Sequence, residues 1–175
     1  MIYNIKRLIR LTMLLVCTAC TSQPKQVTEV SEPAPIYPDY ANVTIPYNIA
    51  PLNFLLRNEV SALQVTVSGQ QESLTVHGNR KVCFPLRKWK NLLEAAKGQT
   101  LTVTITAKVE GKWLQYPTFT WKVVSEKLDS FLSYRLIEPG YEVWNTIQLC
   151  ERNIETFEEK VIADNNLVDG NCMNC

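Results

Sequence analysis

Alternating apolar and polar residues mark the middle of the chain as β-structure. In the stretch TLTVTITAKV, Leu101, Val103, Ile105, Ala107 and Val109 occupy every second position, and threonine or lysine fills the positions between them. Successive side chains of a strand point to opposite faces of the sheet, so this alternation predicts a strand with one buried face. Shorter apolar runs, bounded by Asn, Gly, Pro or Ser, predict further strands: NVTIP, LNFLLR, ALQVTVSG, SLTVHG and KVCF.

One segment between these strands has helical periodicity. The stretch PLRKWKNLLEAAKG has Pro85 at its start and Gly98 at its end, where proline and glycine favour helix boundaries. Its apolar residues share one face at a period of about 3.6 residues; they are Leu86, Trp89, Leu92, Leu93 and Ala96. The pattern predicts a helix that packs on the sheet.

The residues Glu110–Lys112 (EGK) are interpreted as the turn from the clearest strand to a partner strand, WLQYPTFTWKVV. Strands and turns at this spacing predict a mainly β domain over residues 41–125. We expect an immunoglobulin-like β-sandwich in which the helix is the one crossover.

The character of the chain changes after Val124. The stretch LDSFLSYRLIEPGYEVW is rich in aromatic residues and is interrupted by Pro139 and Gly140. In VWNTIQLCERNIETFEEKVI the apolar residues recur at helical spacing; they are Val143, Ile147, Cys150, Ile154, Phe157 and Val161. Residues 126–175 are therefore predicted to be an aromatic loop and a helical connector that ends in a C-x-x-C pair.

The first 19 residues have the features of a secretory signal peptide. Three cations (Lys6, Arg7 and Arg10) precede an apolar run from Leu11 to Val16, which small residues follow. The run is far shorter than the roughly 20 residues of a membrane-spanning helix.

The stretch VCTAC resembles the lipobox of bacterial lipoproteins, with Cys17 at a position where Leu is usual. The resemblance implies cleavage after Ala19 and attachment of lipid to Cys20, and ordinary secretion is the alternative. Acyl chains would anchor the protein to the membrane. Because no acidic run directly follows Cys20, we expect the periplasmic face of the outer membrane.

Residues 20–40 are predicted to be a tether that spaces the domain from the membrane. The segment contains four prolines among Ser, Thr, Gln and Glu, a composition typical of disordered or polyproline II chain; they are Pro24, Pro33, Pro35 and Pro38.

Charge argues against nucleic acid as a partner. The whole chain has a formal net charge of +1, and the signal holds three cations and no acid, so the remainder is near −2. Such a surface has no basic footprint for nucleic acid. No cationic amphipathic stretch follows the signal, so membrane association is expected through the lipid alone.

The C-x-x-C pair, Cys172 and Cys175, is compatible with a zinc half-site, a redox couple, a disulfide or a haem-attachment motif. Zinc is disfavoured because structural sites need four ligands. A thioredoxin-like couple is disfavoured because the pair lies in a polar loop and not at a helix N-terminus. The cysteines could also form a small-ring disulfide or pair with Cys83 or Cys150.

The stretches YPDY, NVTIPYNIAPLNF, WKNLLEAAKG, SYRLIEPGYEVW and ADNN…NCMNC resemble, in their spacing, a family of bacterial lipoproteins. The family is described as TolB-like or WD-repeat-like β-propeller proteins, sometimes as cytochrome c biosynthesis proteins. The resemblance covers Ile36 to Cys175. In the family C-x-N-C-H follows such a region and a propeller comes next.

The resemblance implies that Cys172 and Cys175 match the thioether cysteines of a c-type haem motif. The motif's histidine and the propeller have no counterpart here, so we expect a truncated chain that holds no haem as given, and c-type haem in a full-length relative.

No catalytic constellation is recognisable, so an enzyme is not expected. His77, the single histidine, has no nucleophile placed beside it and is predicted to be a surface or capping residue. No motif pairs two acids for acid–base chemistry, and a glycine-rich phosphate loop is absent; the scattered acids are Glu138, Glu142, Glu158, Glu159 and Asp164. No metal site is predicted.

Cys83 and Cys150 are interpreted as small buried apolar residues, with a disulfide between them as the alternative. Three of the four tryptophans fall at core-compatible spacing, which favours core packing over stacking on a sugar; the four are Trp89, Trp113, Trp121 and Trp144.

Together these features predict a lipid-anchored, non-enzymatic accessory domain that positions a C-terminal haem and propeller module. The aromatic stretch YRLIEPGYEVW is interpreted as docking against that module or the sandwich. A β-sandwich that binds a glycan or an envelope protein is one alternative, and a fragment of an electron-transfer protein is another.

Changing Cys20 to Ser should block lipid attachment, because only the thiol is acylated. Incorporation of labelled palmitate into the variant measures this. Labelling of the variant at the wild-type level would contradict the lipoprotein interpretation.

Overall fold

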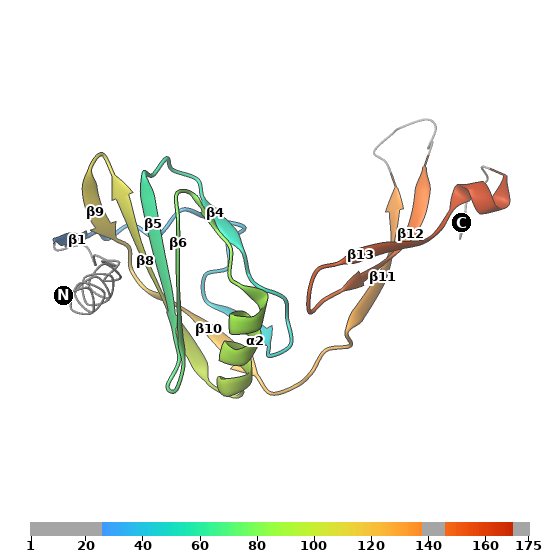
Figure 1. Ribbon diagram of the computed structural model, residues 1–175, viewed down its shortest axis with the longest axis horizontal. Helices are drawn as coiled ribbons and strands as arrows, with labels where there is room; N and C mark the ends of the chain where they lie inside the picture. Colours follow the sequence, from blue (N-terminus) through green and yellow to red (C-terminus); the bar gives the residue numbers. More distant parts are fainter. Residues whose placement is uncertain (1–25, 138–145, 170–175) are drawn as a thin grey trace, which may run out of the picture.

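The computed structural model describes residues 26–137 and 146–169. Within these ranges the chain forms three β-sheets, one α-helix and one short 3-10 helix (Figure 1). The prediction of a mainly β protein is therefore confirmed.

The largest sheet is built around β8 (Thr100–Val109), the clearest strand of the sequence. One edge of β8 pairs with β5, and β5 pairs with β6. The other edge of β8 pairs with β9 along one part of its length and with β10 along another, and β9 and β10 are consecutive in the chain. Outside these lie β1, parallel to β9, and β3, parallel to β10. The strand bounds are β1 Val27–Glu29, β3 Val43–Pro46, β5 Ala62–Ser68, β6 Ser73–Gly78, β9 Lys112–Gln115 and β10 Phe119–Val124.

The turn predicted at Glu110–Lys112 joins β8 to β9. Glu110 and Gly111 both have positive φ, 48° and 83°. Positive φ at both central residues is the requirement of the two-residue type I′ hairpin, whose twist matches that of the strands. The prediction of the turn is confirmed, whereas the predicted partner strand WLQYPTFTWKVV is divided into two strands, β9 and β10, by a break at residues 116–118.

The two faces of β8 differ as the alternation predicted. Leu101, Val103, Ile105 and Ala107 are at most 1% exposed, and Val109 is half-buried beside the turn. On the opposite face Thr100 and Thr102 are exposed, whereas Thr106 is covered. The apolar row therefore faces the core.

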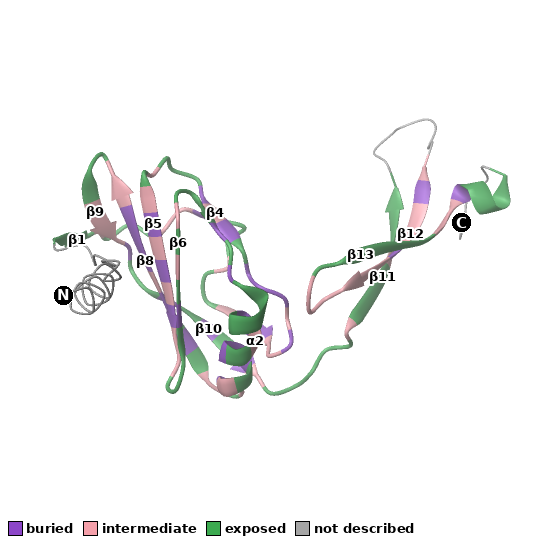
Figure 2. Ribbon diagram, viewed as in Figure 1, coloured by how far each residue is buried: buried purple, intermediate pink, exposed green. Residues whose placement is uncertain are grey.

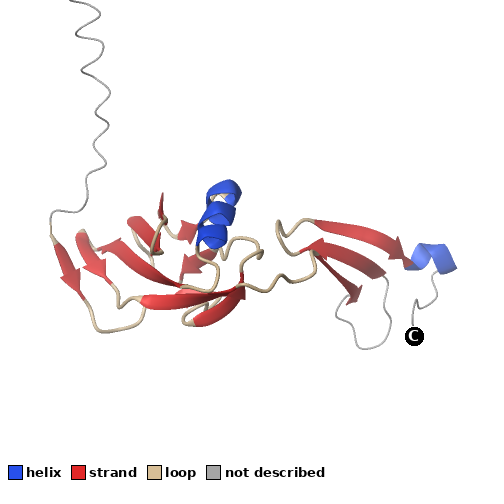
Figure 3. Cartoon of the chain, turned by 90° about the horizontal axis from the view of Figure 1, so that it is seen from below, coloured by secondary structure: helices blue, strands red, loops and turns tan. Residues whose placement is uncertain are grey.

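A second layer covers this row. It consists of a small sheet, β2 (Ile36–Tyr37), β4 (Phe54–Leu56) and β7 (Lys81–Val82), together with the helix α2 (Leu86–Ala95). Their apolar residues join those of β8 in one core cluster, and α2 lies on one side of the large sheet (Figure 3). The helix ends as predicted, with Gly98 at φ 71° shortly after its last turn.

The chain order agrees with an immunoglobulin-like sandwich. The chain passes from β4 in the small sheet to β5 and β6 in the large one, and back to β7 in the small sheet. It then crosses through α2 to β8. Strands that alternate between two sheets are the connection pattern of such sandwiches, so α2 is the predicted crossover helix.

Two tryptophans lie at the centre of the core. Trp89 and Trp121 are fully buried, and their rings meet edge to face with centroids 5.6 Å apart. Each indole N–H donates to a backbone carbonyl, Trp89 to Ile49 at 2.9 Å and Trp121 to Tyr40 at 2.7 Å. Neither ring is available to stack on a sugar. Trp113 is half-buried, and Trp144 lies outside the described residues.

The predicted tether is wrong for the part that the structure describes. β1 pairs with β9 and β2 pairs with β4, and Ile36 is only 5% exposed. The folded domain therefore begins near Val27 and not at residue 41. The proline-rich composition wrongly predicted disorder, because short edge strands such as β1 and β2 tolerate proline nearby. Such strands also pair with segments that are distant in sequence.

The predicted helical connector is also wrong. β11 (Phe131–Ile137), β12 (Ile147–Asn153) and β13 (Glu159–Asp164) form a three-stranded antiparallel sheet, here called the C-terminal sheet. A 3-10 helix, η1 (Asn165–Val168), follows it. The described part of residues 126–175 is thus β-structure.

The helical spacing of this segment has a different origin. Ile147 and Cys150 are both buried, yet β12 pairs with β11 without interruption, so residues three apart point to opposite faces. Phe157, at φ 63°, lies in the turn before β13 and could not continue a helix. Val143 lies outside the described residues.

Replacing Ile105 by Asp should lower the free energy of unfolding by about 3 kcal/mol or more, because it leaves an unpaired charge in the core. Thr104→Asp, one residue away on the opposite face of β8, should have a much smaller effect. Chemical denaturation of both variants measures the difference. Equal losses would show that the faces of β8 are assigned wrongly.

Candidate functional site

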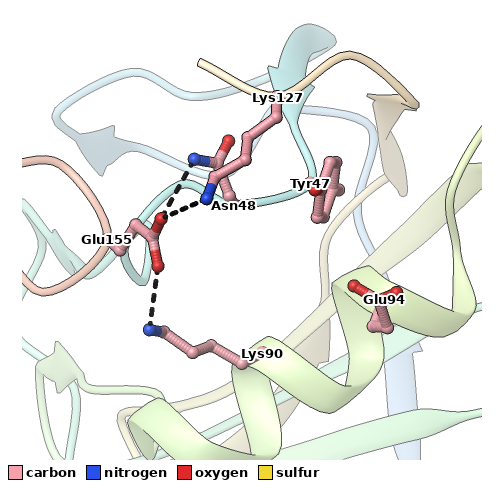
Figure 4. A pocket seen from close by; sticks show the side chains of 6 residues that line it. All are labelled: Tyr47, Asn48, Lys90, Glu94, Lys127 and Glu155. Carbon is pink, nitrogen blue, oxygen red and sulfur yellow. Dashed lines mark hydrogen bonds and ion pairs between the residues drawn. The ribbon is translucent and has the colours of Figure 1, made fainter. Parts of the chain in front are cut away.

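Among the described residues, the polar side chain with the most hydrogen bonds and ion pairs belongs to Glu155, in the turn between β12 and β13. The turn is held by its own backbone: Glu155 N donates to Asn153 Oδ1 at 2.8 Å, and Phe157 N donates to Asn153 O at 2.7 Å. The Glu155 side chain is 22% exposed and points toward the sandwich (Figure 4).

Groups from three other segments converge on this carboxylate. Ser130 Oγ donates to it at 2.9 Å and Asn48 Nδ2 at 3.3 Å. Lys90 Nζ, on α2, lies 3.3 Å from Oε2, and Lys127 Nζ lies 3.5 Å from Oε1. The carboxylate therefore links the C-terminal sheet to the β3–β4 loop, to α2 and to the linker after β10.

Asn48 forms the other half of the junction. It is only 7% exposed, and its amide pairs with the backbone of Leu128: Nδ2 donates to the carbonyl at 2.9 Å, and Oδ1 accepts from the N–H at 3.1 Å. Two backbone bonds add to this, from Ala50 N to Ile154 O and from Ile154 N to Ser130 O. The Glu155 turn is thus attached to the sandwich by Asn48 and Ala50, and to the segment before β11 by Ser130.

A small pocket lies beside the junction. Its volume is about 140 Å³, and it is lined by Tyr47, Asn48, Lys90, Glu94, Lys127 and Glu155. Sites for small molecules usually measure about 300–1,000 Å³ and are mostly apolar. Lys97 Nζ lies 3.7 Å from the centre of the Tyr47 ring and forms an ion pair with Glu94. Two of the side chains that line the pocket therefore already have a partner within the protein.

The electrostatics of the junction favour a structural role. The hydrogen bonds from Ser130 and Asn48, with the lysine contacts, lower the pKa of Glu155 to about 2. A carboxyl that stays ionised at neutral pH cannot act as a general acid, and its basicity is weak. The pocket lining contains no serine, cysteine or histidine that could act as a nucleophile or base.

A second hollow of about 400 Å³ lies where β1 approaches the bend between β9 and β10. It is lined by Glu29, Val30, Gln115, Tyr116, Pro117 and Thr118. Burial, and the nearby Glu32, raise the pKa of Tyr116 above its usual value, so this hydroxyl stays protonated. The lining holds no histidine, cysteine or carboxylate pair.

The structure separates the cysteines that the sequence singled out. Cys150 is buried in β12, as predicted, but Cys83 is exposed after β7, which corrects the prediction that it is buried. Both are free thiols, so the alternative of a disulfide between them is not found. Cys20, Cys172 and Cys175 lie outside the described residues.

The other candidates are dispersed. His77 is exposed near the end of β6, as expected for a surface residue. Glu159 pairs with Arg152 and accepts a hydrogen bond from Tyr134. Asp164 caps η1 by accepting from Asn166 N at 3.0 Å. Glu158 is exposed, and Glu138 and Glu142 lie outside the described residues.

Across residues 26–137 and 146–169, no group of three or more His, Cys, Asp or Glu side chains could hold a metal ion. No helix in the same ranges is long and apolar enough to cross a membrane.

The sequence interpretation missed Glu155. Its partner Asn48 lies 107 residues away along the chain, and no local motif connects the two. The nearest signal is the turn-forming composition of ERNIETFEEK, which the helical interpretation obscured.

Comparisons of the chain with protein-family models, with curated proteins and with solved structures found no match.

Glu155→Gln should lower the free energy of unfolding at pH 7 by about 1–2 kcal/mol, because it removes the charge on which two lysines and two hydrogen-bond donors converge. The native pKa of Glu155, about 2, lies below the value of an unfolded glutamate. The contribution is therefore present at neutral pH and lost as the pH falls from about 5 toward 2. Denaturation curves over this range measure it.

Glu158→Gln is the matched control, since Glu158 lies in the same turn and its side chain has no ion pair in the described part of the chain. It should leave the unfolding free energy nearly unchanged. If the two variants behave alike at every pH, Glu155 does not hold the junction.

Proposed function

We propose that this chain is a non-enzymatic accessory domain of the bacterial cell envelope, anchored at the periplasmic face of the outer membrane by lipid on Cys20. In this proposal the β-sandwich positions the c-type haem and propeller module that follows the C-x-x-C pair in the lipoproteins that the sequence resembles.

The junction at Glu155 is the observation that carries this proposal. Glu155 and Asn48 bind the C-terminal sheet to the sandwich through side chains, and Ala50 does so through its backbone. η1 follows β13 directly, so the chain leaves the C-terminal sheet from a point that the sandwich determines. A positioning role requires such an attachment, whereas a flexible linker would give none.

The haem part of the proposal assigns roles to few residues of this chain. Cys172 and Cys175 would form the two thioether links, and the bound haem would supply one-electron chemistry. His77 lies on β6 of the sandwich and not on the C-terminal sheet, so the described residues place no imidazole there for the iron. The axial histidine is expected after the cysteine pair, where the resembled family has it.

A protein-binding module is the second candidate. Several large apolar side chains of the C-terminal sheet are about half exposed, among them Phe131, Leu132 and Ile162. Exposed apolar residues that gather on one element mark contacts with other proteins. A glycan partner is less well supported, since Trp89 and Trp121 are buried in the core.

Adding a histidine and a few further residues after Cys175 should produce covalent haem with a c-type absorption spectrum, in cells that have the haem-attachment machinery. The chain without this addition should be colourless. Haem-stained gels of membrane fractions and spectra of the purified proteins measure both. Cys172→Ala in the extended chain should weaken or abolish attachment.

The same extended chain tests the anchor separately. With Cys20→Ser, the haem-bearing protein should move from the membrane fraction to the soluble fraction. If the extended chain stays colourless while a control cytochrome matures in the same cells, the haem assignment is wrong. If the Cys20→Ser form remains in the membrane, the anchor assignment is wrong.

A further inference from the structure

β11 is an edge strand of the C-terminal sheet. The strand order is β11-β12-β13, so β11 pairs with β12 on one side and no described strand pairs with its other side. Its ladder with β12 extends over all seven residues without a bulge. An uninterrupted edge of this kind presents a row of backbone donors and acceptors to another chain.

Large apolar side chains lie along this edge. Phe131 and Leu132 are each 56% exposed, Leu136 is 47% exposed and Ile137 is 42% exposed. Figure 2 shows β11 as mostly exposed, in contrast to the buried inner strands of the sandwich. Folded proteins usually protect an edge strand with charges, bulges or covering segments.

The opposite edge of the same sheet has that protection. β13 carries charges at both ends, Glu159 and Lys160 at its start and Asp164 at its end. Its pairing with β12 shifts register between Leu149 and Cys150, which is a β-bulge. β11 contains a single charge, Arg135, and its ladder with β12 has no register shift.

The sequence of β11, FLSYRLI, is symmetric in polarity about Tyr134. In an antiparallel pair of two such strands with the two-fold axis at Tyr134, Phe131 lies opposite Ile137 of the second copy, and Leu132 lies opposite Leu136. Ser133 lies opposite Arg135, so no like charges meet. Apolar cross-strand pairs of this kind stabilise a sheet, and like charges directly opposite destabilise it.

Neighbouring registers lack this match. With the axis moved one residue to Arg135, two guanidinium groups would lie opposite each other. With the axis at Ser133, Phe131 would face Arg135. The pattern therefore selects one register as well as one orientation.

We propose that β11 pairs antiparallel with β11 of a second copy of this chain, with the two-fold axis at Tyr134, so that two C-terminal sheets form one six-stranded sheet. The contact is isologous, as closed dimers require. The proposed dimer contact does not depend on the proposals that Cys20 carries lipid and that Cys172 and Cys175 carry haem. A seven-residue edge contact is small, so the association is weak and reversible.

The test uses the full chain in detergent and measures its self-association by sedimentation equilibrium up to about 100 μM, a range suited to weak interfaces. The unsubstituted chain should show a monomer–dimer equilibrium. Leu132→Lys with Leu136→Lys places lysines opposite each other at two positions and should weaken the dimer by about tenfold or more.

Leu132→Glu with Leu136→Lys is the rescue variant, since each glutamate then faces a lysine of the other copy and dimerisation should return. Val161→Lys with Ile162→Lys, on the protected edge strand, should leave the dimer unchanged. Equal melting temperatures, measured at dilutions where every variant is monomeric, confirm that all variants are folded.

Three outcomes would overturn the proposal. A monomeric unsubstituted chain over the whole concentration range is the first. A dimer that survives the double lysine substitution would place the contact elsewhere. A glutamate–lysine variant as weak as the double lysine variant would exclude the proposed register.

Discussion

The apolar row of β8 is the constraint on which the rest of the structure depends. Leu101, Val103, Ile105 and Ala107 can leave water only if a second layer covers them. The small sheet and α2 provide that layer, and Trp89 and Trp121 meet within it. Because both indole N–H groups donate to carbonyls of the surrounding loops, the core also determines the path of the backbone at Tyr40 and Ile49.

The junction with the C-terminal sheet follows from that path. Asn48 is next to Ile49, whose carbonyl the core holds, and Lys90 is next to Trp89 on the helix. The two residues that meet Glu155 from the sandwich are thus neighbours of residues fixed by core packing. The Glu155 carboxylate accepts hydrogen bonds from Ser130 and Asn48 and lies beside two lysines, which explains its lowered pKa.

The C-terminal sheet is attached to the sandwich at one place and has exposed apolar side chains on one edge strand. One end, the Glu155 turn, is bound to the sandwich by a carboxylate network. Along β11, from Phe131 beside this turn to Ile137, the sheet presents exposed apolar side chains on an edge that no described strand pairs. The sheet is thus held at the Glu155 turn, while the outer side of β11 has no described strand beside it.

The sequence by itself determined most of the sandwich strands, though not β1 and β2, as well as the helix and the buried face of β8. Period-2 and period-3.6 patterns report directly which side chains leave water. It also favoured core packing for three of the four tryptophans, which Trp89 and Trp121 show, and a surface or capping position for His77. Only the tertiary structure decided that Ile147 and Cys150 belong to a strand, since a spacing of three residues fits a helix face and two opposite faces of a strand equally well. Only the tertiary structure brought Glu155 to Asn48, 107 residues apart. Contacts between distant segments depend on the geometry of the complete fold, so local sequence patterns do not predict them.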